Sequence, residues 1–164
     1  MPDWLTYTLV AAGVALLALA VILARGRVFT RWRVAKLLDT FADQRRRLEL
    51  DFLLQAAKLG KPRGLRWLQA DWQPDVFLAW DRTQDGYFAL VEAAFQFEAE
   101  PDSDMIDLPA VALAKAGTAL FAWTGRHWVP TGRVFFNLSP RELLTHRAAQ
   151  FQTLHPLEPM PSRS

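Results

Sequence analysis

The stretch YFALVEAAFQFE, residues 87–98, decides the fold of the domain that occupies most of this chain. Every odd-numbered residue from Tyr87 to Phe97 is apolar, whereas the even-numbered residues begin apolar at Phe88 and become polar towards Glu98. Successive side chains of a strand point to opposite faces of a sheet, so this alternation predicts a half-buried β-strand that is clearest in its second half.

Strand signals continue on both sides of this stretch. Gln73-Pro74-Asp75 is typical of a turn, and Asp85-Gly86 is typical of a β-hairpin. Gly125-Arg126 marks a further tight turn, and Pro130 with Gly132 indicates an edge strand or a bulge after it. We therefore expect strands at residues 65–72, 76–82, 87–98, 111–124 (regular from about Thr118) and 127–137.

A helix is expected on each side of these strands. The first covers residues 31–59, with Thr30 as a candidate N-cap and Gly60 and Pro62 as the stop signal. The second covers residues 140–151, because Ser139-Pro140-Arg141-Glu142 is a capping box with proline in the first turn. In that context Ser139 and Glu142 are helix-capping residues, and Ser139 is not a candidate nucleophile.

The first helix carries a 4-3 pattern that allows two interpretations. Six of its eight positions are apolar: Val34, Leu38, Phe41, Arg45, Leu48, Phe52, Gln55 and Leu59. A narrow stripe of this kind could pair two copies in a coiled coil. The apolar stripe widens after Leu48, which favours packing of the C-terminal half on its own domain. Self-association of the membrane-proximal half stays open. We expect Arg45-Arg46-Arg47 to be solvated surface, with Asp43, Glu49 or Asp51 as candidate ion-pair partners.

The order of elements predicts an N-terminal transmembrane α-helix followed by an α+β domain. The domain combines a long helix, a five-stranded antiparallel meander over residues 65–137, and a C-terminal helix, with both helices packed on one face of a curved sheet. This layout resembles, at the level of fold only, the helix-in-sheet domains of the cystatin-like and NTF2-like kind, and it implies no particular activity.

The transmembrane prediction rests on LTYTLVAAGVALLALAVILA, residues 5–24, which contains no charged side chain. At a rise of about 1.5 Å per residue, a helix of this length spans about 30 Å, the thickness of the hydrocarbon core of a bilayer. Aromatic residues flank the stretch at both ends, where interfacial aromatic side chains are expected. These residues are Trp4, Tyr7, Phe29 and Trp32.

The flanking charges predict the orientation. Five basic residues, our candidates for contact with lipid headgroups, follow the apolar stretch: Arg25, Arg27, Arg31, Arg33 and Lys36. Only Asp3 precedes it, so the positive-inside rule places the N-terminus outside and the remaining chain in the cytoplasm. The alternative is a signal peptide cleaved at Ala18-Leu19-Ala20, but a basic n-region and a short apolar core are missing.

These signals divide the chain into four parts: a membrane anchor (1–24), a basic junction (25–30), a cytoplasmic domain (31–155) and a flexible tail (156–164). The net charge of +2 conceals a strong segregation. Residues 25–66 hold twelve Lys/Arg against four Asp/Glu, residues 67–107 hold one against ten, and residues 108–164 hold six against two. Because the largest basic block adjoins the apolar stretch, anionic lipid explains it better than nucleic acid does.

No pattern of catalytic, cofactor-binding or metal-ligating residues stands out. The chain has no cysteine, and its three histidines, His127, His146 and His155, lack the spacing of a zinc site. The acidic residues 98–107 lack the turn glycine and the final glutamate of a calcium loop. Four aspartates could pair for acid–base chemistry, but two of them are ordinary turn residues: Asp71, Asp75, Asp81 and Asp85.

Tryptophan is the remaining candidate for a binding role, because aromatic side chains on a sheet can fill a core, form a protein interface or line a ligand pocket. The candidate residues are Trp67, Trp80, Trp123 and Trp128. We therefore expect a single-pass membrane protein whose domain is a non-catalytic interaction or scaffold module, with the bilayer and a protein or second copy as partners. The alternative is a ligand-binding or weakly enzymatic domain with a pocket between helix and sheet.

Overall fold

A computed structural model describes the backbone of residues 3–59, 65–99 and 114–154. Side chains are described for Leu16 and for residues 31–59, 65–98 and 114–154. The chain divides into two compact units, Met1–Leu37 and Leu38–Ser164. The predicted acidic loop and the predicted tail at 156–164 lie outside the described residues.

Helix α1 extends without interruption over Asp3–Lys58. The sequence predicts two helices separated by a junction at residues 25–30, so the single uninterrupted helix differs from the prediction. Its physical reason is that Gly26 costs a helix only about 1 kcal/mol relative to alanine, and no proline occurs between Asp3 and Lys58. The C-terminal end at Lys58 agrees with the prediction within one residue.

No helical segment among the described residues is long and apolar enough to cross a membrane. The predicted span at residues 5–24 lies outside the residues whose side chains are described, apart from Leu16.

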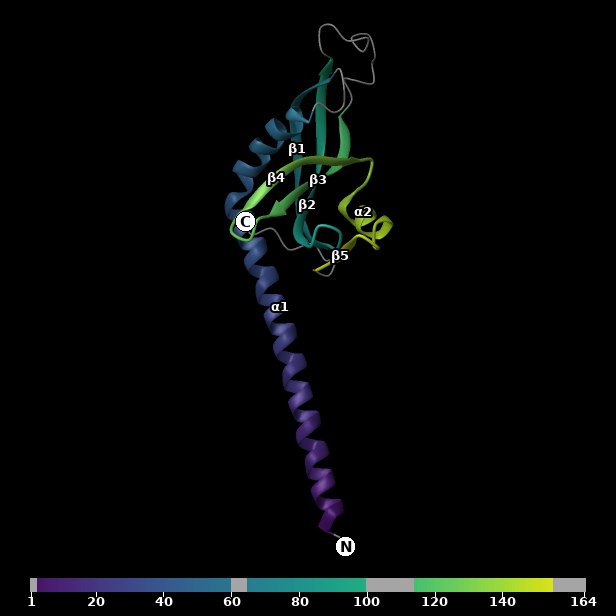
Figure 1. Cartoon of the computed structure of the whole chain (residues 1–164). Helices are drawn as coiled ribbons and strands as arrows, with labels where there is room; N and C mark the ends of the chain where they lie inside the picture. Colours follow the sequence, from purple (N-terminus) through teal and green to yellow (C-terminus); the bar gives the residue numbers. More distant parts are fainter. Residues whose placement is uncertain (1–2, 60–64, 100–113, 155–164) are drawn as a thin grey trace. The chain divides into compact units, whose positions relative to one another are not determined.

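The unit Leu38–Ser164 contains a five-stranded sheet that is antiparallel throughout, which confirms the predicted α+β class. The strands occur in the order β4-β3-β2-β1-β5, so the first four form a meander and the fifth joins the free side of β1 (Figure 1). Their bounds are β1 Leu65–Asp81, β2 Gly86–Ala99, β3 Lys115–Trp123, β4 Trp128–Phe136 and β5 Phe151–Thr153.

The structure corrects two predictions about the strands: the turn at residues 73–75 and the absence of a strand after the C-terminal helix. Residues 73–75 are an irregularity within one long strand and not a turn, because pairing with β2 resumes at Val76 after a register shift that begins at Trp72. Helix α2 covers only Pro140–His146 and not residues 140–151. The chain then turns, and residues 151–153 form β5 against the end of β1, although Phe151 was predicted to end that helix.

The α1 side of the sheet carries the aromatic core of this unit. Phe52 of α1 is fully buried, and its ring centroid lies 5.2 Å from that of Phe121 and 6.2 Å from that of Phe95. Phe41 and Leu48 are also buried, at 1% and 4% exposure. Packing of the C-terminal half of this helix on its own domain is therefore confirmed.

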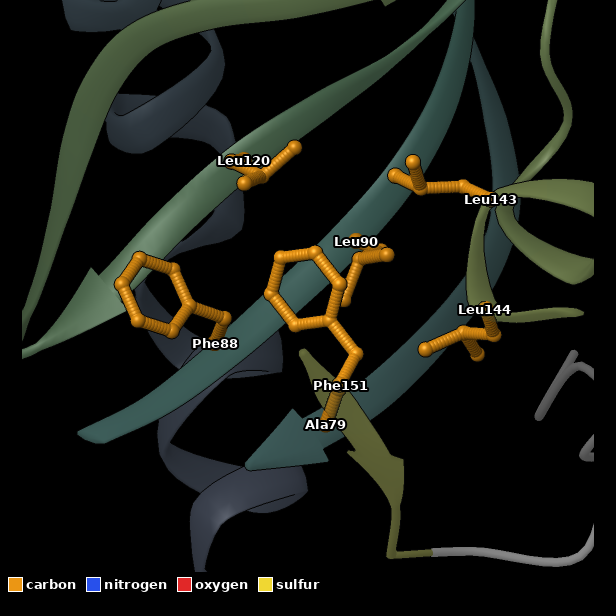
Figure 2. Packing of buried hydrophobic residues seen from close by; sticks show 7 residues of the cluster. All are labelled: Ala79, Phe88, Leu90, Leu120, Leu143, Leu144 and Phe151. Carbon is orange, nitrogen blue, oxygen red and sulfur yellow. The ribbon is translucent and has the colours of Figure 1, made fainter. Parts of the chain in front are cut away.

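Helix α2 packs on the opposite side of the sheet, so the prediction that both helices share one face is wrong. Figure 2 shows side chains from α2 pointing toward side chains of the central strands. The buried cluster comprises Ala79, Phe88, Leu90, Leu120, Leu143, Leu144 and Phe151. Near its start, β2 carries apolar residues on both of its faces. A second core therefore forms on the α2 side of the sheet.

Candidate functional site

The described members of the predicted headgroup and interfacial residues lie on α1, within the unit Met1–Leu37. Arg31, Arg33 and Lys36 are exposed, and the Trp32 side chain is 60% exposed. The ammonium nitrogen of Lys36 lies 5.3 Å from the centroid of the Trp32 ring, within cation–π range. The other predicted headgroup and interfacial residues, Arg25, Arg27, Trp4, Tyr7 and Phe29, lie outside the residues whose side chains are described.

The candidate tryptophans are part of packed aromatic contacts. Trp128 is 2% exposed, and its ring lies 5.5 Å from Phe41 and 5.3 Å from Trp123. Trp67 is half-buried against Phe95, Phe97 and Phe136 at centroid distances of 5.3, 4.8 and 6.2 Å.

Trp80, also half-buried, packs edge-on against Tyr87 across the β1–β2 pair at 4.7 Å. The ring centroid of Trp72 lies 5.5 Å from that of Phe52. The rings of Trp72 and Trp128 thus lie between α1 and the sheet.

Asp81 is the most strongly constrained carboxylate in the described chain. It is 1% exposed, and its Oδ1 accepts hydrogen bonds from the Thr83 amide (2.8 Å), the Thr83 hydroxyl (2.6 Å) and the Gln84 amide (3.3 Å). Its Oδ2 accepts from the side-chain amides of Gln84 (3.2 Å) and Gln150 (2.9 Å). The carboxylate therefore joins the β1–β2 turn to the segment that precedes β5.

These hydrogen bonds decide the charge of Asp81. Burial alone raises the pKa of this carboxyl group, but the hydrogen bonds, beginning with that from the Thr83 side chain, outweigh burial and lower the pKa below its ordinary value. An ionised carboxylate whose two oxygens both accept hydrogen bonds is suited to an anchoring role and poorly suited to accepting a proton. Asp71 is ten residues away on the same strand, about 30 Å at the usual rise, so the two do not form a pair.

The capping box predicted at the start of α2 is present. The amide of Glu142 donates to the Ser139 hydroxyl oxygen at 3.3 Å, and the Ser139 amide donates to the Glu142 carboxylate at 2.8 Å. The backbone hydrogen bond from Ser139, with a further one from its hydroxyl, lowers the pKa of Glu142. Glu142 therefore remains negatively charged near the helix N-terminus.

Arg45 has a role that the sequence does not reveal. The expected ion pair with Glu49 is present at 2.7 Å. The guanidinium group also donates to the carbonyl oxygen of Pro74 (2.6 Å) and to that of Gln73, so Arg45 is not merely solvated surface. These two contacts were not predicted because their acceptors lie 29 and 28 residues away in the chain. Arg45 holds the irregular segment of β1 against α1.

Three exposed arginines lie over aromatic rings on the α2 side of the sheet. The guanidinium carbons of Arg133 and Arg147 lie 5.8 and 5.0 Å from the centroid of Phe135, and that of Arg141 lies 5.6 Å from the centroid of Phe77. Phe77 and Phe135 pack against the buried α2 cluster. We call Arg133, Phe135, Arg141 and Arg147 the arginine face. It was not predicted, because its members come from β4, α2 and the turn after α2.

Scans of protein-family models, curated proteins and solved structures find no match to this chain. Within the described residues, no three His, Asp or Glu side chains are grouped so that they could hold a metal ion. Of the three histidines considered as zinc ligands, His127 and His146 are exposed, and His155 lies outside the described residues. The function therefore has to be inferred from the chain's own surfaces.

Proposed function

We propose that this chain is a single-pass membrane protein whose cytoplasmic α+β domain acts as a non-catalytic interaction module. The observation that carries the proposal is the uncharged stretch at residues 5–24, followed at once by five basic residues. A stretch of this length matches the hydrocarbon core, and the basic flank favours an N-out, C-in orientation.

Features of the unit Met1–Leu37 support the anchor. Leu16, near the middle of the uncharged stretch, is 68% exposed, which suits a side chain that faces lipid. Trp32 is exposed beneath the Lys36 ammonium group. Tryptophan beside a basic side chain is typical of the membrane–water interface, where the ring lies at headgroup level and the charge reaches phosphate.

The interior of the other unit favours an interaction module over the alternative of a ligand-binding or weakly enzymatic domain. That alternative requires a pocket between helix and sheet. The rings of Phe41, Phe52, Trp72 and Phe121 instead pack against one another there, with centroid distances of 5.2–5.9 Å.

A protein-binding role is supported by the outer surface of α1. Leu50 and Leu54, one helical turn apart, are each 65% exposed. Adjacent exposed leucines on one helix face are suited to contact with a protein partner or a second copy.

The anchor is tested by protease accessibility of a C-terminal tag in right-side-out and inverted vesicles, with the intact mass recorded on the same sample. We expect a full-length chain whose tag is cleaved only in inverted vesicles. A chain that begins at Val21, or a tag that is cleaved from outside, would contradict the proposal.

A matched pair of variants separates the anchor from general damage. Arginine at the centre of a transmembrane helix costs roughly 2.5–3.5 kcal/mol of insertion free energy. Leu16→Arg should therefore shift the chain towards the carbonate-extractable fraction. Leu54→Arg places the same residue at an equally exposed leucine of the other unit and should leave extraction unchanged. Equal extraction of the two variants would reject residues 5–24 as the anchor.

A further inference from the structure

The outer side of β1 is an open sheet edge over residues 65–72. On this side β5 pairs only with Ala79–Asp81. Between the two segments, the Arg45 guanidinium group binds the carbonyl oxygens of Gln73 and Pro74. Among the described residues, no strand other than β2 pairs with residues 65–72. The backbone groups of such an edge can pair with an added strand.

The edge on the opposite side of the sheet is covered by α1. The Trp128 amide at the start of β4 donates to Oε1 of Gln44 at 3.2 Å, and Pro130 has no amide hydrogen to donate. Gly132 lies so close to α1 that an added Cβ would be 2.9 Å from the carbonyl carbon of Gln55. An added strand therefore fits the edge of β1 and not that of β4.

The alternation of the backbone decides how an added strand can pair with β1. Along a strand, the backbone groups of one residue point toward one neighbouring strand and those of the next residue point the other way. Arg66 and Asp71 lie opposite Glu98 and Ala94, which are four residues apart on β2, so both point toward β2. They are five residues apart on β1, and this is possible only because the register skips Leu68 as an extra residue. The side chains of Arg66 and Asp71 therefore lie on the same face of the sheet.

The shared face makes this edge complementary to itself. If a second copy of β1 runs antiparallel with its Asp71 opposite Arg66, its Arg66 lies opposite the first Asp71, and Leu65 lies opposite Trp72. Opposite charges directly across an antiparallel pair attract each other, and symmetry provides two such pairs.

The charges at this edge are accessible to a second copy. Asp71 is exposed and makes no ion pair among the described residues. Arg66 is paired with Glu98 of its own chain, but the two side chains are 68% and 50% exposed, so the guanidinium group can reach a second carboxylate.

We propose that two copies of this chain pair through the outer edges of β1, antiparallel and with Arg66 of each copy opposite Asp71 of the other. The inference rests on the proposed interaction module, whose partner it names as a second copy, and not on the membrane anchor. The two sheets then form one continuous sheet. Because each copy contributes the same surface, the pairing closes at two copies and does not extend into a filament.

The first test uses the absence of cysteine from this chain. In this register the two-fold axis passes beside Leu68. A strand spacing of about 4.8 Å and a rise of about 3.3 Å place the Cα atoms of the two copies of residue 68 about 6 Å apart, within reach of a disulfide. The full-length Leu68→Cys chain in detergent micelles should therefore form a cross-linked dimer under mild oxidation.

Leu50→Cys is the matched control for this cross-link. Leu50 is an exposed leucine on the outer surface of α1, at 65% against 50% for Leu68. We expect the Leu50→Cys chain to remain free of the cross-link. Cross-linking at position 50 and not at position 68 would overturn the inference in favour of pairing through α1.

Exchange of the two charges tests the register. Arg66→Asp and Asp71→Arg each place like charges opposite each other in two symmetric pairs, which should weaken self-association about tenfold or more. A mixture of the two variants restores opposite charges at both pairs, so the mixed dimer should form about as tightly as the unsubstituted one. Sedimentation of the full chain in density-matched micelles measures each association. Arg46→Asp makes the same change of charge at an exposed position of α1 and should leave self-association unchanged.

Three results would overturn the inference. The first is a chain that stays monomeric at all concentrations, which is expected if another segment of the same chain covers this edge. The second is equal weakening by Arg46→Asp and Arg66→Asp. The third is failure of the mixed variants to associate. Near-ultraviolet circular dichroism shows whether each variant is folded, and Asp71→Arg carries the test if Arg66→Asp unfolds through loss of its contact with Glu98.

Failure of the pairing is distinguishable from failure of the proposed anchor. A monomeric chain that resists carbonate extraction, and whose tag is cleaved only in inverted vesicles, retains the anchor and its topology and lacks the pairing. A chain that carbonate releases from vesicles, but that cross-links at position 68, retains the pairing and lacks the anchor.

Discussion

Strand β4 approaches the backbone of α1 closely at Gly132, and replacing this residue tests the packing of that strand on the helix. Gly132 adopts a positive φ of 70°. An added Cβ atom would lie 2.9 Å from the carbonyl carbon of Gln55 and 3.0 Å from both the Gln55 oxygen and the Ala56 nitrogen. All three are backbone atoms of α1, so a side-chain rotation cannot relieve the clash.

The expected cost of Gly132→Ala has two parts. A residue with a Cβ in the left-handed region costs roughly 1–2 kcal/mol. Forcing an extra carbon into a packed contact costs about 1–3 kcal/mol more. Gly125→Ala is the matched control, because Gly125 also has a positive φ, of 94°, but an added Cβ would meet nothing within 4 Å. We therefore expect Gly132→Ala to be the more destabilising by about 2 kcal/mol.

Urea unfolding of the full chain in detergent micelles, followed by tryptophan fluorescence, measures this difference in the free energy of unfolding. Trp128 lies at the start of β4 and is buried, so its emission reports on the strand that is perturbed. Equal destabilisation by the two substitutions would show that only the backbone conformation matters. The close packing of β4 on α1 would then be refuted.

Further substitutions test three sets of polar contacts by the same unfolding measurement. The pKa of Asp81 is lowered in the folded chain. The stability that this carboxylate gives the fold is therefore complete above the unfolded-state pKa and is lost as pH falls through the folded-state pKa. Asp81→Asn should remove this acid dependence and cost about 2–3 kcal/mol of unfolding free energy at neutral pH. Ser139→Ala should cost about 1 kcal/mol, and Glu142→Gln less, because glutamine still accepts from the cap amide. Arg45→Met should cost about 1–2 kcal/mol, whereas Arg46→Met at an exposed position should change stability by less than about 0.5 kcal/mol. Equal effects at positions 45 and 46 would contradict the clamp on β1.

Local signals account for the parts of the fold that the sequence predicts well. The alternating residues 87–98 form most of β2, and the odd-numbered side chains of this strand lie on the α1 side of the sheet. Asp85 has a positive φ of 52°, as its place before Gly86 in the hairpin suggests. The capping box set the start of α2 at Pro140. In each case the deciding interaction lies within a few residues of the signal.

Non-local contacts account for the failures. Residues 73–75 have turn chemistry, yet they stay within β1, where Arg45 binds their carbonyl groups across 28 and 29 residues of chain. Helix α2 ends early because Phe151 is buried in the cluster on the α2 side and its strand pairs with β1. Neither contact is accompanied by a periodic sequence pattern near the segment whose structure it changes.

The candidate tryptophans show the same limit. Composition alone could not distinguish a filled core from a pocket, because both require large aromatic residues in one region. The ring contacts of Trp128 and Trp67 depend on partners from α1 and from neighbouring strands. Spacing in the sequence does not specify which face such a ring occupies until the register of the whole sheet is known.

The segregation of charge along the chain does not persist in space once the register is known. Arg133 and Arg147 of the basic C-terminal block lie over Phe135. The register places Phe135 opposite Thr118, and Thr118 opposite Glu92 of the acidic block. Blocks of opposite charge that are separate in the sequence therefore meet across three neighbouring strands, and a count of charges along the chain does not reveal this.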